Sequence, residues 1–207
     1  KVPVSKPSPL KLSESSGDGS DSRVRMAALA LFKQASAEGM RVAEAMLFED
    51  GSGTACAARL SHLQDEIIRC LYDFAITHVM RASNLSAGER MSIIAVGGYG
   101  RGTLAPGSDL DLLFLLPYKQ TAWGESVVEY MLYMLWDLGF KVGHATRSVD
   151  ECIRLSATDS TILTAMLEAR YLWGDEALFD DLQVRYRKDL VKARGAAKAF
   201  IATKLQE

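Results

Sequence analysis

Two short apolar runs joined by a glycine-rich segment constrain the fold of this chain most. Residues 91–96 and 109–116 are rich in branched apolar residues and end at Gly and Pro respectively, which predicts two buried strands. Between them, a Gly-Gly pair at 97–98 is followed, after ten residues, by the sequence Asp-Leu-Asp-Leu. The chain must therefore place a tight glycine turn and an acidic strand beside each other in one small sheet.

The acidic strand supplies the candidate catalytic groups. Asp109 and Asp111 are two residues apart, and side chains alternate across a strand, so both carboxylates are predicted on one face. Leu110 and Leu112 then point to the other face, into the core. Two neighbouring carboxylates repel each other in an apolar setting unless a cation bridges them. The pair therefore predicts a site for a hard divalent cation, Mg²⁺ above all, with both aspartates as ligands.

The segment before the acidic strand carries groups that suit a phosphate. Gly97 and Gly98 follow the first strand, and glycine allows positive φ and close approach of the backbone to a ligand. Backbone N–H groups at such a turn bind anions, Arg101 adds a positive fork, and Ser108 adds a hydroxyl. Phosphate donors and metal ligands in one place are what transfer from a nucleoside triphosphate requires.

Helical periodicity surrounds the two strands. A first helix is expected after Ser22 and a second after the Gly-Ser-Gly break at 51–53, and a third strand is expected at 140–147. The remaining helices are expected over about 122–138, 161–172, 177–186 and 191–205. This pattern predicts a small sheet of about three strands between helices, in a mixed α/β or α+β domain.

Composition excludes several classes of function. Hydrophobic residues make up 48% of the chain, which rules out a mostly disordered protein. Lys and Arg number 24 against 26 Asp and Glu, so binding of nucleic acid by bulk positive charge is not expected. The three cysteines form no CxxC pair, and no signal peptide or long apolar run is present. We therefore expect a cytoplasmic protein with no membrane partner.

Three stretches together point to a known family. The string at 97–113, Gly-Gly-Tyr-Gly-Arg-Gly-Thr-Leu-Ala-Pro-Gly-Ser-Asp-Leu-Asp-Leu-Leu, resembles the motif of the polymerase-β-type nucleotidyltransferase superfamily. It is most similar to the family of bacterial PII uridylyltransferase/uridylyl-removing enzymes, and the stretches at 136–147 and 167–175 support this. The resemblance covers about residues 25–207 and implies an α+β fold, a small mixed sheet of three or more strands packed by helices.

The resemblance also implies an activity. Enzymes of this family use UTP and Mg²⁺, with Mn²⁺ a possible substitute, to attach UMP to a tyrosine of the PII signalling protein, and pyrophosphate is released. They remove the UMP in an HD domain and sense glutamine through ACT domains. His62, His78 and His144 are isolated and form no HD-type pair. We therefore expect an N-terminal fragment, with a disordered tail at 1–22 and a transferase domain at 23–207.

The family's site residues carry over to matching positions. The resemblance assigns the triphosphate to Gly97, Gly98, Arg101 and Ser108, and it assigns the metal and catalysis to Asp109 and Asp111. On the third strand, Arg147 could also reach a phosphate of the nucleotide. The roles of two further side chains remain undecided. Tyr99 could stack on a base or pack in the turn, and His144 could face the site or be structural.

One departure from the superfamily keeps alternatives open. A third carboxylate is usual on a later strand, but residues 141–147 contain no acid. The chain could therefore be a non-catalytic nucleotide-binding or regulatory module. It could also be a nucleotidyltransferase with another acceptor, as in the related glutamine synthetase adenylyltransferases.

Overall fold

The computed structural model describes residues 22–80, 88–118 and 120–192. The predicted tail at 1–22 and the helix expected at 191–205 lie almost entirely outside these residues. The helices are α1 (Ser22–Asp50), α2 (Gly53–Phe74) with a π-helical extension η1 (Ala75–Val79), α3 (Gly97–Gly100), α4 (Ala122–Asp137), α5 (Val149–Ser156), α6 (Ser160–Leu167) and α7 (Glu176–Lys192). The strands are β1 (Ser92–Ala95), β2 (Leu110–Leu116), β3 (Val142–Ser148) and β4 (Arg170–Gly174).

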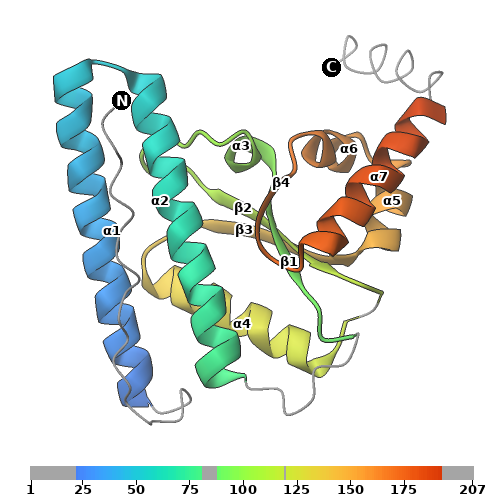
Figure 1. Ribbon diagram of the computed structural model, residues 1–207, viewed down its shortest axis with the longest axis horizontal. Helices are drawn as coiled ribbons and strands as arrows, with labels where there is room; N and C mark the ends of the chain where they lie inside the picture. Colours follow the sequence, from blue (N-terminus) through green and yellow to red (C-terminus); the bar gives the residue numbers. More distant parts are fainter. Residues whose placement is uncertain (1–21, 81–87, 119, 193–207) are drawn as a thin grey trace.

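The four strands form one mixed sheet in the order β3-β2-β1-β4 (Figure 1). β1 is antiparallel to both β2 and β4, whereas β2 and β3 are parallel and are joined through α4. The α+β class and the two central strands are as predicted, and β3 follows the third expected strand. The acidic strand β2 thus lies inside the sheet, and β3 forms one of its two edges.

The two faces of the sheet are covered by different helices. One face presents residues such as Leu112 and Phe114 to the helices α1, α2 and α4, where the larger apolar core forms. The other face presents Ile94, Leu113 and Leu115 to a smaller core with α5, α6 and α7, which gather on the opposite side in Figure 1. Side-chain alternation along β2 places Asp111 on this second, less filled face.

One expected helix is wrong in its second half. The pattern predicted a helix over 161–172, but α6 ends at Leu167 and residues 170–174 form β4 instead. The run Arg-Tyr-Leu-Trp-Gly has strand-forming aromatics, and pairing with β1 satisfies its backbone. Gly174 ends the strand with φ +96°, where a Cβ would lie 2.4 Å from the Met91 carbonyl oxygen. Tertiary pairing therefore overrides the helical periodicity of this segment.

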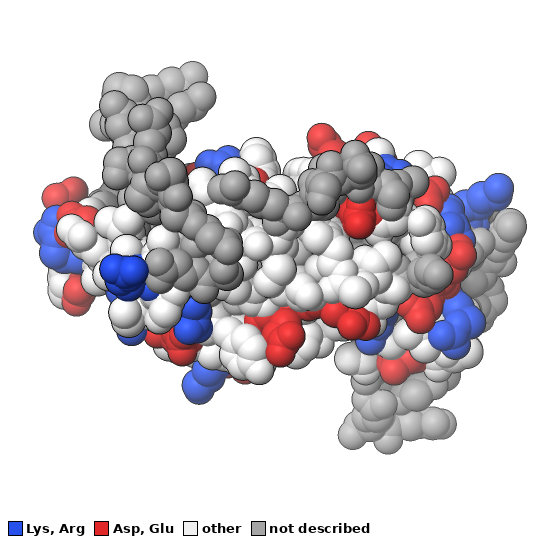
Figure 2. All heavy atoms as spheres, turned by 90° about the horizontal axis from the view of Figure 1, so that it is seen from below, with Lys and Arg blue, Asp and Glu red and all other residues white. Residues whose placement is uncertain are grey.

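The surface agrees with the charge balance of the sequence. Figure 2 shows acidic and basic side chains interspersed over the lower face, without a continuous basic patch. In the part of the chain that the structure describes, no helix combines the length and apolarity needed to cross a bilayer.

Candidate active site

The glycine turn α3 lies directly against the acidic strand. Gly97 begins the turn with φ +57°, a conformation that favours glycine. A Cβ at this position would lie 3.1 Å from Oδ2 of Asp111, and one at Gly98 would lie 3.4 Å from the Arg101 guanidinium. The predicted phosphate turn and the predicted metal ligand are therefore neighbours.

The two aspartates occupy different environments. Asp111, within β2, is half-buried, whereas Asp109 is exposed just before the strand begins. Leu110 and Leu112 are buried against the opposite core, which confirms the predicted alternation. Among the described residues, neither carboxylate has an ion-pair partner, so the positive charge that such a pair needs is not supplied by a described side chain.

Burial and mutual repulsion perturb Asp111. Its removal from water raises the pKa of the Asp111 carboxyl above the ordinary value, and the negative charge of Asp109 raises it further. Both effects disfavour the ionised pair and both are offset by a bound cation. The donor set therefore fits a hard divalent ion held by two carboxylates.

A second glycine, Gly143 on β3, provides the space for Asp111. The parallel register pairs Asp111 with Gly143, and a Cβ at Gly143 would lie 2.4 Å from Oδ1 of Asp111. The Asp111 carboxylate thus lies between Gly97 and Gly143. Sequence reasoning missed Gly143, because only the register between two strands shows which residue lies opposite the acid.

No third acid joins the pair on β3, as the sequence predicted. Across the described ranges, no group of three or more His, Cys, Asp or Glu side chains is arranged to hold a metal ion.

A cavity of about 350 Å³ opens beside Asp111. Gly97, Gly143 and Arg147 line it from the sheet side, and Thr161 and Thr164 of α6 line it from the other side. Arg147 is half-buried and has no hydrogen-bond or ion-pair partner among the described residues. The structure therefore brings a free guanidinium, a glycine turn and a carboxylate into one cavity of suitable size for part of a nucleotide.

Arg101 lies at the rim of this cavity in an exposed ion pair. Its Nη1 donates to Oε1 of Glu168 at 2.7 Å, and Glu168 also lines the cavity. The Arg101 side chain is 58% exposed, so its remaining donors are accessible to a ligand.

Ser108 lies apart from the other predicted phosphate contacts. It is exposed and lines a separate cavity of about 340 Å³ with Leu110 and Lys141, on the side of α1 and α2. Its own N–H donates to the Ala105 carbonyl. The structure therefore places Ser108 next to Asp109 in sequence but outside the cavity that contains Asp111.

An ion-pair network fixes the position of the glycine turn. The Arg170 guanidinium donates two hydrogen bonds to the Asp65 carboxylate of α2, at 2.7 and 3.0 Å. It also donates to the carbonyls of Tyr99 and Gly100, both at 3.3 Å. A Cβ at Gly100 would lie 2.0 Å from the Glu168 carbonyl oxygen, so α3 packs directly on the chain that leads into β4.

Tyr99 belongs to this network and does not face the cavity. Its ring is fully buried under the Arg170 guanidinium, and its hydroxyl donates to Oδ1 of Asp65 at 2.7 Å. Burial raises the pKa of Tyr99 strongly, and the Asp65 charge adds to the rise. Of the two roles left open, packing in the turn is the one that the structure supports.

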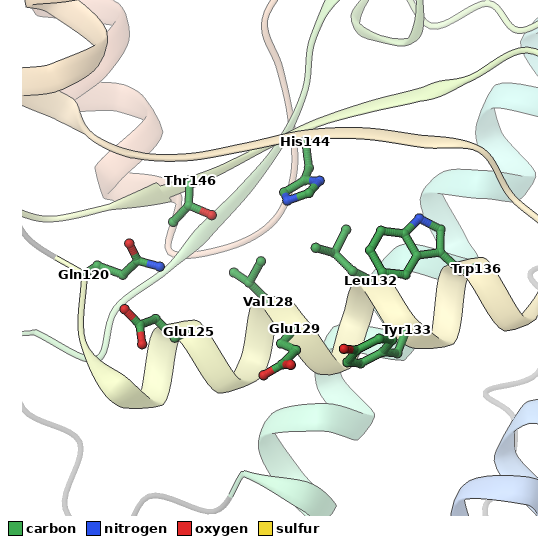
Figure 3. Close-up of a pocket in the computed structure, with 9 residues that line it drawn as sticks. All are labelled: Gln120, Glu125, Val128, Glu129, Leu132, Tyr133, Trp136, His144 and Thr146. Carbon is green, nitrogen blue, oxygen red and sulfur yellow. The ribbon is translucent and has the colours of Figure 1, made fainter.

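His144 lines two cavities, the one beside Asp111 and a groove along α4. It alternates with Gly143 and Arg147 along β3, and its ring points toward α4 (Figure 3). It lines a groove with Trp136 and Tyr133 of that helix. Of the two roles left open for His144, the direction of its ring favours the structural one.

Comparisons with known proteins agree with this geometry. A family model described as glutamate-ammonia ligase adenylyltransferase matches residues 9–133, more than half of the chain. Two bifunctional uridylyltransferase/uridylyl-removing enzymes, from two strains of Caulobacter vibrioides, are each 54% identical over 189 residues, or 91% of this chain. The chain spans about one fifth of their length, since the matched region covers 20% of each. The resemblance to uridylyltransferases and to the polymerase-β-type fold is confirmed, and the chain belongs to the glutamate-ammonia ligase adenylyltransferase family of nucleotidyltransferases.

Proposed function

We propose that this chain transfers UMP from UTP to a tyrosine hydroxyl of a PII signalling protein, with Mg²⁺ as cofactor and with release of pyrophosphate. The observation that carries this proposal is the Asp111 carboxylate between Gly97 and Gly143, open to a cavity that also contains Arg147. The names of the two relatives support uridylyl rather than adenylyl transfer.

Each predicted residue has a role in this proposal. Asp109 and Asp111 would hold Mg²⁺ or Mn²⁺, which supplies charge neutralisation and acidifies the acceptor hydroxyl when bound. The N–H groups of the 97–98 turn orient the triphosphate, and Arg147 and Arg101 take its outer oxygens. The acceptor hydroxyl gives its proton to solvent and its oxygen bonds to the α-phosphorus, while the bond from the α-phosphorus to the oxygen that bridges to the β-phosphorus breaks and pyrophosphate leaves.

The extent of the functional unit is part of the same proposal. We assign the transferase domain to residues 23–207 and a linker to 1–22. Ser108 remains a proposed triphosphate contact, although its cavity is the neighbouring one. We propose that removal of UMP and sensing of glutamine are the work of HD and ACT domains and not of residues 1–207, and that transfer needs no nucleic acid or membrane.

Two other functions have an observation in their favour. The family model is described as an adenylyltransferase, which favours ATP and another acceptor. The glycine opposite Asp111, where a third acid is absent, favours a module that binds nucleotide without turnover. Competition of UTP with ATP, CTP and GTP separates the first from uridylylation, and pyrophosphate release separates the second.

The decisive experiment follows transfer of labelled UMP to PII by the full-length protein. Asp111→Asn is expected to abolish transfer and pyrophosphate release, because the amide is a poor ligand for a hard cation, while the fold persists. Asp180→Asn, at an exposed site on α7, is the matched control and is expected to keep full activity. Transfer by Asp111→Asn at the level of the unsubstituted protein would refute the assignment.

A further inference from the structure

The strand beside the cavity has a free edge without the usual protection. Among the residues that the structure describes, β3 ends the sheet and pairs with β2 alone. Its seven residues contain no Pro and no Lys, the pairing with β2 has no bulge, and Arg147, which lines the cavity, is its one Lys or Arg residue. Edge strands of natural proteins usually carry Pro, Lys or a bulge, because an edge without them can pair with a strand of another chain. The exposed Gly143 and His144 leave this edge accessible.

A groove of about 290 Å³ runs between β3 and α4, on the face opposite Asp111 (Figure 3). Tyr133 and Trp136 line it and remain 50% and 46% exposed, with their rings edge to face at 5.7 Å. Glu125 and Glu129 line it as well, and neither carboxylate has an ion-pair partner among the described residues. Carboxylates beside exposed aromatic faces suit a Lys or Arg side chain.

We propose that an extended segment of the acceptor protein pairs with the outer edge of β3 and places a basic side chain in this groove. This docking rests on the proposed function, since it names how the acceptor reaches the same site. It also commits to one occupant, a basic segment next to the acceptor hydroxyl. Strand addition of this kind takes affinity from backbone hydrogen bonds and specificity from alternate side chains.

The register of β3 explains why one segment can serve both faces. Gly143, Ala145 and Arg147 face the Asp111 side, whereas His144 and Thr146 face the groove. An added strand alternates in the same way, so adjacent residues enter the cavity and the groove. A residue beside Gly143 would lie two strand spacings, about 10 Å, from the Asp111 backbone. A tyrosine and an aspartate side chain together bridge that distance.

The first test removes the groove charges without changing its shape. The double variant Glu125→Gln/Glu129→Gln is expected to raise KM for the acceptor about 2- to 30-fold, because two exposed ionic contacts are lost while the aromatic rings remain. KM for UTP and kcat stay unchanged. Added salt weakens acceptor binding by the unsubstituted protein more than by the variant. Glu176→Gln/Asp180→Asn, exposed on α7, is the matched control.

The second test needs no turnover. Hydrogen exchange is measured with and without PII, and slower exchange is expected over 142–148 but not over 170–174, at the opposite edge of the sheet. An unchanged acceptor KM in the double variant, or no protection of β3, overturns the docking even where UMP transfer occurs. Failure of transfer with β3 protected overturns the proposed function instead. If exchange over β3 slows without PII as the concentration of this chain rises, the edge pairs with a second copy of the chain, and the docking proposal is overturned.

Discussion

The two flanks of Asp111 are built very differently. On one flank, Gly97 belongs to a turn whose carbonyls are tied through Arg170 to Asp65 of α2. On the other flank, Gly143 belongs to an edge strand with a neighbour on one side only. Both glycines give room to the same carboxylate, but of the two only Gly97 lies in a segment that a part-buried ion-pair network holds in place. The comparison indicates that the side of Asp111 that would bind UTP is preorganised and that the side that would meet the acceptor protein is accessible.

This difference has a physical reason. A triphosphate must be held in one geometry for in-line transfer, and a displacement of about 1 Å can cost about 100-fold in rate. A protein acceptor must instead enter and leave, so the strand that meets it gains from an unpaired edge. Variants beside Gly97 should therefore change KM for UTP, whereas variants along the outer edge of β3 should change KM for the acceptor.

The largest effect is expected on the β3 flank, from Gly143→Ala. The new Cβ would lie 2.4 Å from Oδ1 of Asp111, so the carboxylate must move, and kcat is expected to fall about 100-fold. The φ of Gly143 is not positive, so backbone strain does not confuse the result. Gly53→Ala is the control, because a Cβ there meets no atom within 4 Å. Steady-state kinetics measure kcat. An unchanged kcat would show that the Asp111 carboxylate does not need the space that Gly143 leaves.

The next largest effect is expected from Arg170→Met, which loosens the turn that contains Gly97. Loss of the guanidinium removes the ion pair with Asp65 and the hydrogen bonds to the Tyr99 and Gly100 carbonyls, so the turn is held less firmly and KM for UTP is expected to rise about tenfold. The free energy of unfolding should fall by about 2–3 kcal/mol, as for other hydrogen bonds to charged groups. KM for the acceptor should change little.

Arg170→Lys separates positioning from charge, because a lysine keeps the charge but not the fork that spans Asp65 and the turn. It should recover part of the stability and little of the UTP affinity. Recovery of both together would assign Arg170 a role in folding alone.

A smaller effect is expected from Glu168→Gln at the cavity rim. The exposed Arg101–Glu168 pair contributes about 0.2–1 kcal/mol, and release of Arg101 makes its whole fork available to phosphate. KM for UTP should therefore decrease about 1.5- to 5-fold, and the melting temperature should fall by at most about 4 °C. An increase in KM would mean that Glu168 itself contributes to nucleotide binding.

The smallest effect concerns pH and the carboxylate between the flanks. Burial and the Asp109 charge raise the pKa of Asp111 in the folded protein above its unfolded value. Its contribution to stability is then present at acid pH and lost as the pH rises through the folded pKa. Asp111→Asn should therefore melt slightly above the unsubstituted protein at neutral pH, without metal, and the difference should vanish in acid. A lower melting temperature at neutral pH would contradict the raised pKa.

Much of this site was predictable because its main parts are close in sequence. Gly97, Asp109 and Asp111 fall within fifteen residues, and strand alternation alone places Leu110 and Leu112 in the core. The cavity wall from α6, the position of Ser108 and the orientation of His144 were not predictable, because they depend on how distant elements pack. β4 was mistaken for a helix because its aromatic residues also fit helical spacing.

The sequence by itself determined the acidic strand, the glycine turn before it and the α+β class, since these follow from local periodicity and from glycine's conformational freedom. Only the tertiary structure decided that Gly143 lies opposite Asp111 and that Arg170 ties the turn to α2. It also decided that β3 ends the sheet. The reason is physical: register and edge position arise when segments tens of residues apart pair and pack, and no local pattern encodes which residue will face which.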